Sequence, residues 1–212
     1  MEYRLLFISH QTDRYSYLES IQLALRGGCK LIQLRMKGAT DAEVREVAIE
    51  AKKECQLYEA LLTIDDRVEL GRELGLDGVH LGLSDLPIDK ARALWSDEVL
   101  MGGTANTLDD MLMHQERGAN YIGLGPFRFT STKKRLSARL GLKGYRELLA
   151  LAKAKRMRLP IYAIGGIQPK DIPALMAAGV WGIALSSTIL EADDPVEQTK
   201  SILEIIKNCI NE

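Results

Sequence analysis

The chain has 212 residues, of which 46% are hydrophobic and 27% are charged, a balance typical of a globular chain with one substantial core. Its 28 Lys and Arg nearly balance its 29 Asp and Glu, so the overall charge gives no reason to expect nucleic acid or an anionic membrane as a partner. No apolar run reaches the roughly 18 residues that a membrane span needs. Three cysteines without metal-ligand spacing argue against a disulfide framework. We therefore expect a single domain over residues 1–212 in the reducing cytoplasm, with partners bound at local sites.

Eight short apolar runs, each suited to a buried parallel strand, recur along the chain. In chain order they are LLFIS, LIQL, LLTI, GVHL, VLMGG, YIGL, IYAI and GIAL. Amphipathic helical patterns lie between them, at residues 41–59, 108–117, 144–155, 169–178 and 195–211, and the helices after LLTI and GVHL are expected to be short. Because parallel neighbours need a crossover helix, this alternation favours a closed α/β barrel of the (β/α)8 TIM type. A doubly wound open sheet is the alternative.

Two small-residue segments follow the last two expected strands, on the loops where a TIM barrel places its chemistry. Gly165 and Gly166 allow the backbone to approach an anion closely, and Ser186 and Ser187 occupy a place where such barrels commonly bind phosphate. In the alternative interpretation, the glycines only turn the chain and the serines cap the next helix. We favour a phosphate site.

Carboxylates follow the third and fourth expected strands. Asp66 and Asp85 could reach one cation above the barrel mouth, with Asp65 as a third carboxylate beside them. Their hard oxygen ligands suggest Mg²⁺, which commonly combines one or two carboxylates with phosphate oxygens of a substrate. Taken separately, each acidic loop is better explained as a helix cap or a turn. Basic side chains at neighbouring strand ends favour the metal interpretation, because they would hold a diphosphate that the cation bridges. These are Arg35, Lys37 and Lys133.

The order and spacing of six motifs resemble the thiamine phosphate synthase family, which includes the thiazole tautomerases. The motifs are QLRMKG, IDDRVEL, LDGVHLGLSD, ANYIGLGPFRFTSTKK, YAIGGIQP and AGVWGIALSSTIL. The resemblance extends over nearly the whole chain. It implies a TIM-barrel transferase that joins a hydroxymethylpyrimidine diphosphate to a thiazole phosphate, carboxylated or not, with release of pyrophosphate and formation of thiamine monophosphate. It also implies Mg²⁺ as cofactor and suggests a homodimer as one assembly.

The same resemblance assigns roles to individual positions. The pyrimidine diphosphate would be bound by Gln33, Arg35, Met36, Lys37, Asp65, Thr104 and Lys133. The thiazole phosphate would be bound by Thr130, Ser131, Thr132, Gly166, Ser186 and Ser187, and magnesium by Asp66 and Asp85. The implied mechanism is dissociative: the pyrimidine C–O bond breaks to a carbocation that the thiazole nitrogen captures. The catalytic side chains would be Arg35, Lys37 and Lys133, because they stabilise the charge that grows on the departing pyrophosphate.

Some positions depart from the family pattern, and other functions remain open. Asp65 stands where the family more often has Asn, and an ionised carboxylate accepts hydrogen bonds but cannot donate one to a ring nitrogen. Arg128 is either a further phosphate ligand or a solvated loop charge. One alternative function is an isomerase like the thiazole tautomerases, which need no diphosphate metal site. The other is a non-catalytic sensor of a phosphorylated ligand.

Overall fold

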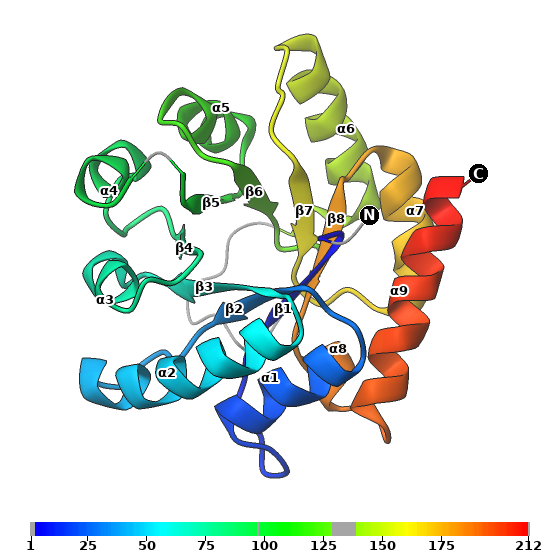
Figure 1. The fold of residues 1–212 in the computed structure, drawn as a ribbon. Coiled ribbons are helices and arrows are strands. Elements are labelled where there is room, and N and C mark those ends of the chain that lie inside the picture. The colour runs from blue at the N-terminus through cyan, green and yellow to red at the C-terminus, as the bar shows by residue number, and fades with distance from the viewer. Residues whose placement is uncertain (1–2, 97, 129–138, 212) are drawn as a thin grey trace.

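The computed structural model describes residues 3–96, 98–128 and 139–211. Within these residues, eight parallel strands close into one barrel, in which each strand pairs with its sequence neighbours and the last pairs with the first (Figure 1). The strands are β1 (Leu5–Ile8), β2 (Leu31–Leu34), β3 (Leu61–Asp65), β4 (Gly78–Leu81), β5 (Leu100–Ala105), β6 (Tyr121–Leu124), β7 (Ile161–Ile164) and β8 (Gly182–Leu185). The prediction of a TIM barrel is confirmed, and the open sheet is excluded.

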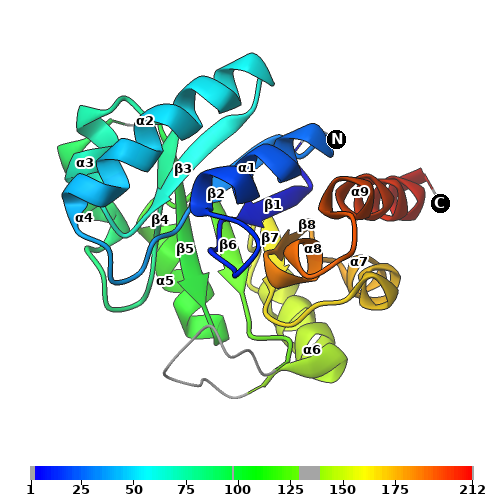
Figure 2. The same ribbon diagram turned by 90° about the horizontal axis from the view of Figure 1, so that it is seen from below.

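Helices surround the barrel on its outside (Figures 1 and 2). They are α1 (Tyr17–Arg26), α2 (Asp41–Leu57), α3 (Val68–Glu73), α4 (Ile88–Leu94), α5 (Leu108–Glu116), α6 (Gly141–Ala154), the 3-10 turn η1 (Pro169–Asp171), α7 (Ile172–Ala178), α8 (Ser187–Leu190) and α9 (Pro195–Asn211). As predicted, α3 and α4 are short. Capping boxes fix the starts of α1, α2 and α5, where the hydroxyls of Ser16, Thr40 and Thr107 accept hydrogen bonds from the first turn. In the described part of the chain, every helix is too short or too polar to cross a membrane.

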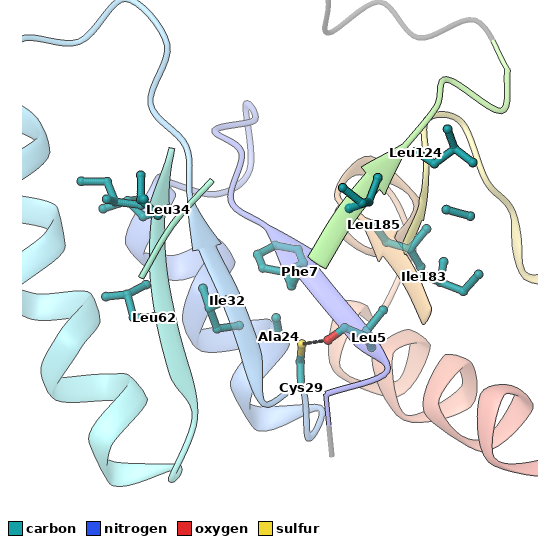
Figure 3. Close-up of a cluster of buried hydrophobic side chains, with 14 of the residues drawn as sticks. Leu5, Phe7, Ala24, Cys29, Ile32, Leu34, Leu62, Leu124, Ile183 and Leu185 are labelled. Carbon is teal, nitrogen blue, oxygen red and sulfur yellow. Dashed lines mark hydrogen bonds between the residues drawn. The ribbon is translucent and has the colours of Figure 1, made fainter. Parts of the chain in front are cut away.

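Strand alternation sends successive side chains to opposite faces of the barrel wall. In β1, Leu5 and Phe7 pack outward in the core layer between strands and helices (Figure 3). Leu6 belongs to a second cluster, formed with Tyr121 and Tyr162. Cys29 also packs in the outer layer, where burial raises the pKa of its thiol to about 11, as expected for a packing cysteine.

The register places polar side chains at the mouth of the barrel. In β2, Ile32 and Leu34 are in the outer core layer, so Gln33 points to the inside, and β3 pairs with β4 so that Asp65 lies beside His80. Gln33, Asp65 and His80 are all buried. The barrel therefore buries three polar side chains near the C-terminal ends of its strands.

Candidate functional site

A cavity of about 450 Å³ opens at the C-terminal ends of the strands, the face on which TIM barrels place their chemistry. Arg35 and Thr104, predicted to bind the pyrimidine diphosphate, line it after β2 and on β5. Gly166, Ser186 and Ser187, predicted to bind the thiazole phosphate, line it after β7 and β8. The structure therefore brings residues predicted for two different phosphorylated substrates to one cavity.

Gln33, Arg35 and Asp65 form a connected polar group on β2 and β3. The Nε2 of Gln33 donates to Oδ1 of Asp65 at 2.7 Å, and the Nε of Arg35 lies 3.3 Å from Oδ2 of the same carboxylate. Burial raises the pKa of Asp65, against the opposing charges of Arg35 and Lys37. Because a carboxylate only accepts, Gln33 presents its amide nitrogen to Asp65 and keeps Oε1 as an acceptor, which has no hydrogen-bond partner among the described residues. Asp65 thus orients its two neighbours.

His80 and Tyr121 fix the position of Thr104. The Nε2 of His80 lies 2.9 Å from the Thr104 hydroxyl, and its Nδ1 lies 3.1 Å from the Tyr121 hydroxyl. His80 and Tyr121 are buried, whereas Thr104 reaches the cavity wall. We conclude that His80 supports a lining residue from within the barrel.

Acidic neighbours affect the titration of Asp66. Burial, the neighbouring carboxyl group of Asp85 and the nearby charge of Asp65 raise the pKa of Asp66 to about 7. Asp66 has a φ of 66°, in the left-handed region, and Asp85 also accepts a hydrogen bond of 2.6 Å from the Gly82 N–H. The alternative that an aspartate after β3 caps the next helix is not what the structure shows. Helix α3 begins after Arg67, and no side chain makes a capping hydrogen bond there.

The carboxylates of Asp66 and Asp85 have the chemistry that a magnesium site requires. Two adjacent carboxylates repel each other unless a proton or a cation lies between them. The described residues contain no group of three or more His, Cys, Asp or Glu side chains placed to hold a metal. A pair of carboxylates fits Mg²⁺, which commonly binds one or two protein carboxylates and completes its shell with water and substrate oxygens.

The backbone after β7 has a conformation that favours glycine. Gly165 and Gly166 have φ values of 99° and 64°, which side chains other than glycine rarely adopt. After the neighbouring strand β8, Ser186 precedes α8 but makes no side-chain capping hydrogen bond. The alternative that this serine caps its helix is therefore not what the structure shows.

Arg128 makes contacts with a neighbouring loop that the sequence did not predict. Its guanidinium makes a bidentate ion pair with Asp171, in which Nη1 contacts Oδ2 and Nη2 lies 2.7 Å from Oδ1. Nη1 also donates to the Gly166 carbonyl at 3.1 Å, and the group lies 4.6 Å from the Phe127 ring centre. Arg128 is therefore not simply a solvated loop charge, and its predicted alternative role as a phosphate ligand stays a prediction.

The remaining predicted residues have different surroundings. Met36 is 6% exposed, packs in the outer core layer and does not line the cavity. Lys37 is exposed, and its charge acts on Asp65 and Asp66. Thr130, Ser131, Thr132 and Lys133 lie outside the described residues.

The loop after β1 also contributes to the cavity, which was not predicted from the sequence. Ser9 and His10 line the cavity, and the Ser9 hydroxyl accepts a hydrogen bond of 2.9 Å from the Arg35 N–H. Their position in the sequence could have indicated this, because both residues directly follow the first apolar run, at the end of the barrel where the site is expected. Asn106 and Glu191 also line the cavity without having been predicted.

Comparisons with known proteins identify the family. The family model described as thiamine monophosphate synthase matches residues 5–189. A thiamine-phosphate synthase of Bacteroides fragilis is 56% identical over 95% of this chain and 98% of its own, and one of Flavobacterium johnsoniae is 46% identical over 90% of each. The solved structure of thiamine phosphate pyrophosphorylase from Pyrococcus furiosus has a TM-score of 0.85 at 30% identity and covers 99% of this chain and 98% of its own. This chain therefore belongs to the thiamine monophosphate synthase family.

Proposed function

We propose that this protein is a thiamine-phosphate synthase, a transferase that condenses hydroxymethylpyrimidine diphosphate with a thiazole phosphate to give thiamine monophosphate and pyrophosphate. The observation that carries the proposal is one cavity lined both by Arg35 and Thr104, predicted for the pyrimidine diphosphate, and by Gly166, Ser186 and Ser187, predicted for the thiazole phosphate. Two phosphorylated substrates bound by these residues would meet inside it. A relative with this name, 56% identical over nearly the whole of both chains, supports the same activity.

The reaction breaks the C–O bond between the pyrimidine methylene group and the diphosphate, whose oxygen leaves with the electron pair. The thiazole nitrogen then donates its lone pair to the carbocation and forms the new C–N bond. Arg35 and Lys37 stabilise the negative charge that grows on the departing pyrophosphate. Because Arg35 is tied to Asp65 and, through its backbone, to Ser9, its charge is positioned before the reaction begins.

Asp66 and Asp85 would hold Mg²⁺, which supplies further positive charge to the diphosphate when it is bound. Replacing either aspartate by alanine should reduce turnover at least about 100-fold, by analogy with the loss of a single charge-stabilising group. Isothermal titration of Mg²⁺ in the presence of inorganic pyrophosphate gives a second readout that does not depend on turnover. Asp109→Ala, an exposed aspartate in the first turn of α5, is the control and should change neither measurement.

The direct test is to mix the purified protein with both substrates and Mg²⁺ and to measure pyrophosphate and thiamine monophosphate. Formation of both in equal amounts supports the transferase. If the protein bound both substrates but released no pyrophosphate, the transferase assignment would be wrong, and the tautomerase-like isomerase or the ligand sensor would take its place. Among these functions, the Asp66 and Asp85 pair favours the transferase, because only that reaction handles a diphosphate.

The setting of the reaction is also part of the proposal. We place it in the cytoplasm, where the thiols of Cys29, Cys55 and Cys209 would stay reduced. A homodimer is the assembly we propose, and light scattering during size-exclusion chromatography tests it.

A further inference from the structure

Three consecutive carbonyl groups at the end of β7 are held by the segment that follows β6. The Ile164 carbonyl accepts the Phe127 N–H at 2.9 Å, and the Gly165 carbonyl accepts the Arg128 N–H at the same distance. The Gly166 carbonyl accepts Nη1 of Arg128 at 3.1 Å. The first two contacts are made by backbone, but the third depends on a side chain.

These contacts determine where the following N–H groups point. In a trans peptide, the C=O and N–H bonds point in opposite directions. Each peptide whose carbonyl faces the Phe127 and Arg128 segment therefore directs its N–H away from that segment. The groups concerned are the N–H of Gly165, Gly166 and Ile167, and these three residues line the cavity. Among the described residues, no backbone carbonyl accepts the N–H of Gly166 or Ile167.

Arg128 can make the third contact because Asp171 holds its guanidinium. The Asp171 side chain is only 10% exposed, against 43% for Arg128, and it is itself fixed by a hydrogen bond of 2.8 Å from the Gln168 N–H. The guanidinium of Arg128 lowers the pKa of Asp171 below its ordinary value, so the carboxylate stays ionised at neutral pH. The planar fork of arginine lets one side chain contact both carboxylate oxygens and a carbonyl, which a lysine cannot match.

We infer that Arg128 and Asp171 are positioning residues for the phosphate of the thiazole substrate: by holding the Gly166 carbonyl, they present the N–H group of Ile167 to that phosphate. This inference rests on the proposed function and concerns how its phosphate site is held in place. Neither residue touches the reacting atoms. Their effect is to keep the Ile167 N–H in place, beside the Gly166 N–H that the backbone already holds, so that binding does not have to order it.

The test uses three variants and measures equilibrium binding by calorimetry, with the thiazole phosphate and the pyrimidine diphosphate as separate probes. Arg128→Ala removes the guanidinium that contacts Asp171 and the Gly166 carbonyl. Asp171→Asn keeps an oxygen to accept the Gln168 N–H but removes the charge that holds Arg128. The double variant combines both changes. Arg45→Ala is the matched control, because it breaks a similar bidentate ion pair, here with Glu73 on the outside of α2 and α3. The two contacts of that pair are 2.7 and 2.6 Å long.

We expect each single variant to weaken binding of the thiazole phosphate roughly tenfold, and the double variant to weaken it by about the same factor, because the two residues act as one unit. Binding of the pyrimidine diphosphate should stay within about twofold of the wild type, which is the spread expected when no contact is lost. Arg45→Ala should bind both probes like the wild type.

Several outcomes would overturn the inference. These are unchanged binding of the thiazole phosphate in Arg128→Ala, equal weakening of both probes, independent additive effects in the double variant, or a wild type that does not bind the thiazole phosphate. The proposed function fails in a different way. A wild type that bound both probes but made no thiamine monophosphate would refute the transferase, while the binding ratios would still decide the role of Arg128 and Asp171.

Discussion

The Gln33 amide and the Asp65 carboxylate are joined by a hydrogen bond of 2.7 Å across strands β2 and β3, inside the mouth of the barrel. With Arg35 at 3.3 Å from its other oxygen, both oxygens of Asp65 already have partners in the protein. Asp65 thereby orients the Gln33 amide and the Arg35 guanidinium, of which Arg35 lines the cavity. The predicted contact of Asp65 with the pyrimidine substrate stays a prediction.

Replacing Asp65 tests this arrangement. In Asp65→Ala, the Gln33 amide loses its acceptor and Arg35 loses its ion pair at a buried site, so the free energy of unfolding should fall by about 2 to 4 kcal/mol. In Asp65→Asn, the new side chain still accepts from Gln33 but no longer attracts Arg35, so we expect a smaller loss of stability and a raised KM for the pyrimidine diphosphate. Urea denaturation and steady-state kinetics measure the two effects. Equal stability in Asp65→Ala and the wild type would show that the contacts of Asp65 with Gln33 and Arg35 contribute nothing to the free energy of unfolding.

Arg35→Ala should reduce kcat roughly 100- to 1,000-fold, because one positioned positive charge on the leaving pyrophosphate is lost. Arg35→Lys should recover only part of the activity, since an ammonium group cannot reproduce the fixed fork beside Asp65. The measurement is the steady-state release of pyrophosphate at saturating substrate. If Arg35→Ala kept a kcat within about threefold of the wild type, Arg35 would have no place in the chemical step.

His114 links stability to pH. Its Nε2 lies 2.9 Å from the Thr104 carbonyl, its Nδ1 is buried without a hydrogen-bond partner among the described residues, and a Cβ on Gly103 would lie 2.6 Å from its ring. Burial lowers the pKa of His114, with the Thr104 carbonyl and Asp110 opposing. Below about pH 6.5, His114 therefore binds a proton in the unfolded chain more readily than in the folded protein. As a result, the free energy of unfolding falls as the pH drops through the pKa of His114 in the folded protein.

Comparing the wild type with His114→Gln isolates this contribution from other titrating groups. Between about pH 7.5 and pH 5, the wild type should lose more thermal stability than the variant, whatever their absolute Tm values. Thermal unfolding followed by circular dichroism over this range provides the measurement. Parallel pH profiles for the two proteins would rule out His114 as the cause.

Gly78 allows β4 and β5 to pair closely. A Cβ at this position would lie 1.9 Å from the Leu100 carbonyl oxygen, which belongs to the backbone and cannot rotate away. Gly78→Ala should therefore lower the free energy of unfolding by about 4 kcal/mol or more, among the largest effects seen for point substitutions. Gly144→Ala in α6, where the nearest atom is the Leu140 Cβ at 3.2 Å, should stay within about 1 kcal/mol of the wild type. Chemical denaturation of both variants makes the comparison, and equal stabilities would contradict it.

Several features of this protein follow from its sequence alone. Eight apolar runs separated by helical patterns were enough to predict the barrel, because parallel strands require crossover helices and the alternation leaves few other topologies. The same reasoning located Arg35, Thr104, Gly166, Ser186 and Ser187 at or after the C-terminal ends of strands, where they line the cavity, because these ends all meet on one face.

Only the tertiary structure decided which of these side chains are paired. Arg128 and Asp171 are 43 positions apart, and Gln33 and Asp65 are 32 positions apart, so no local pattern indicates that either pair makes contact. The packing of His114 against Gly103 likewise arises where α5 folds back on β5. Local periodicity determines which elements form and which way their residues face, whereas the partner of a charged or buried polar group depends on how distant loops and strands are brought together when the barrel closes.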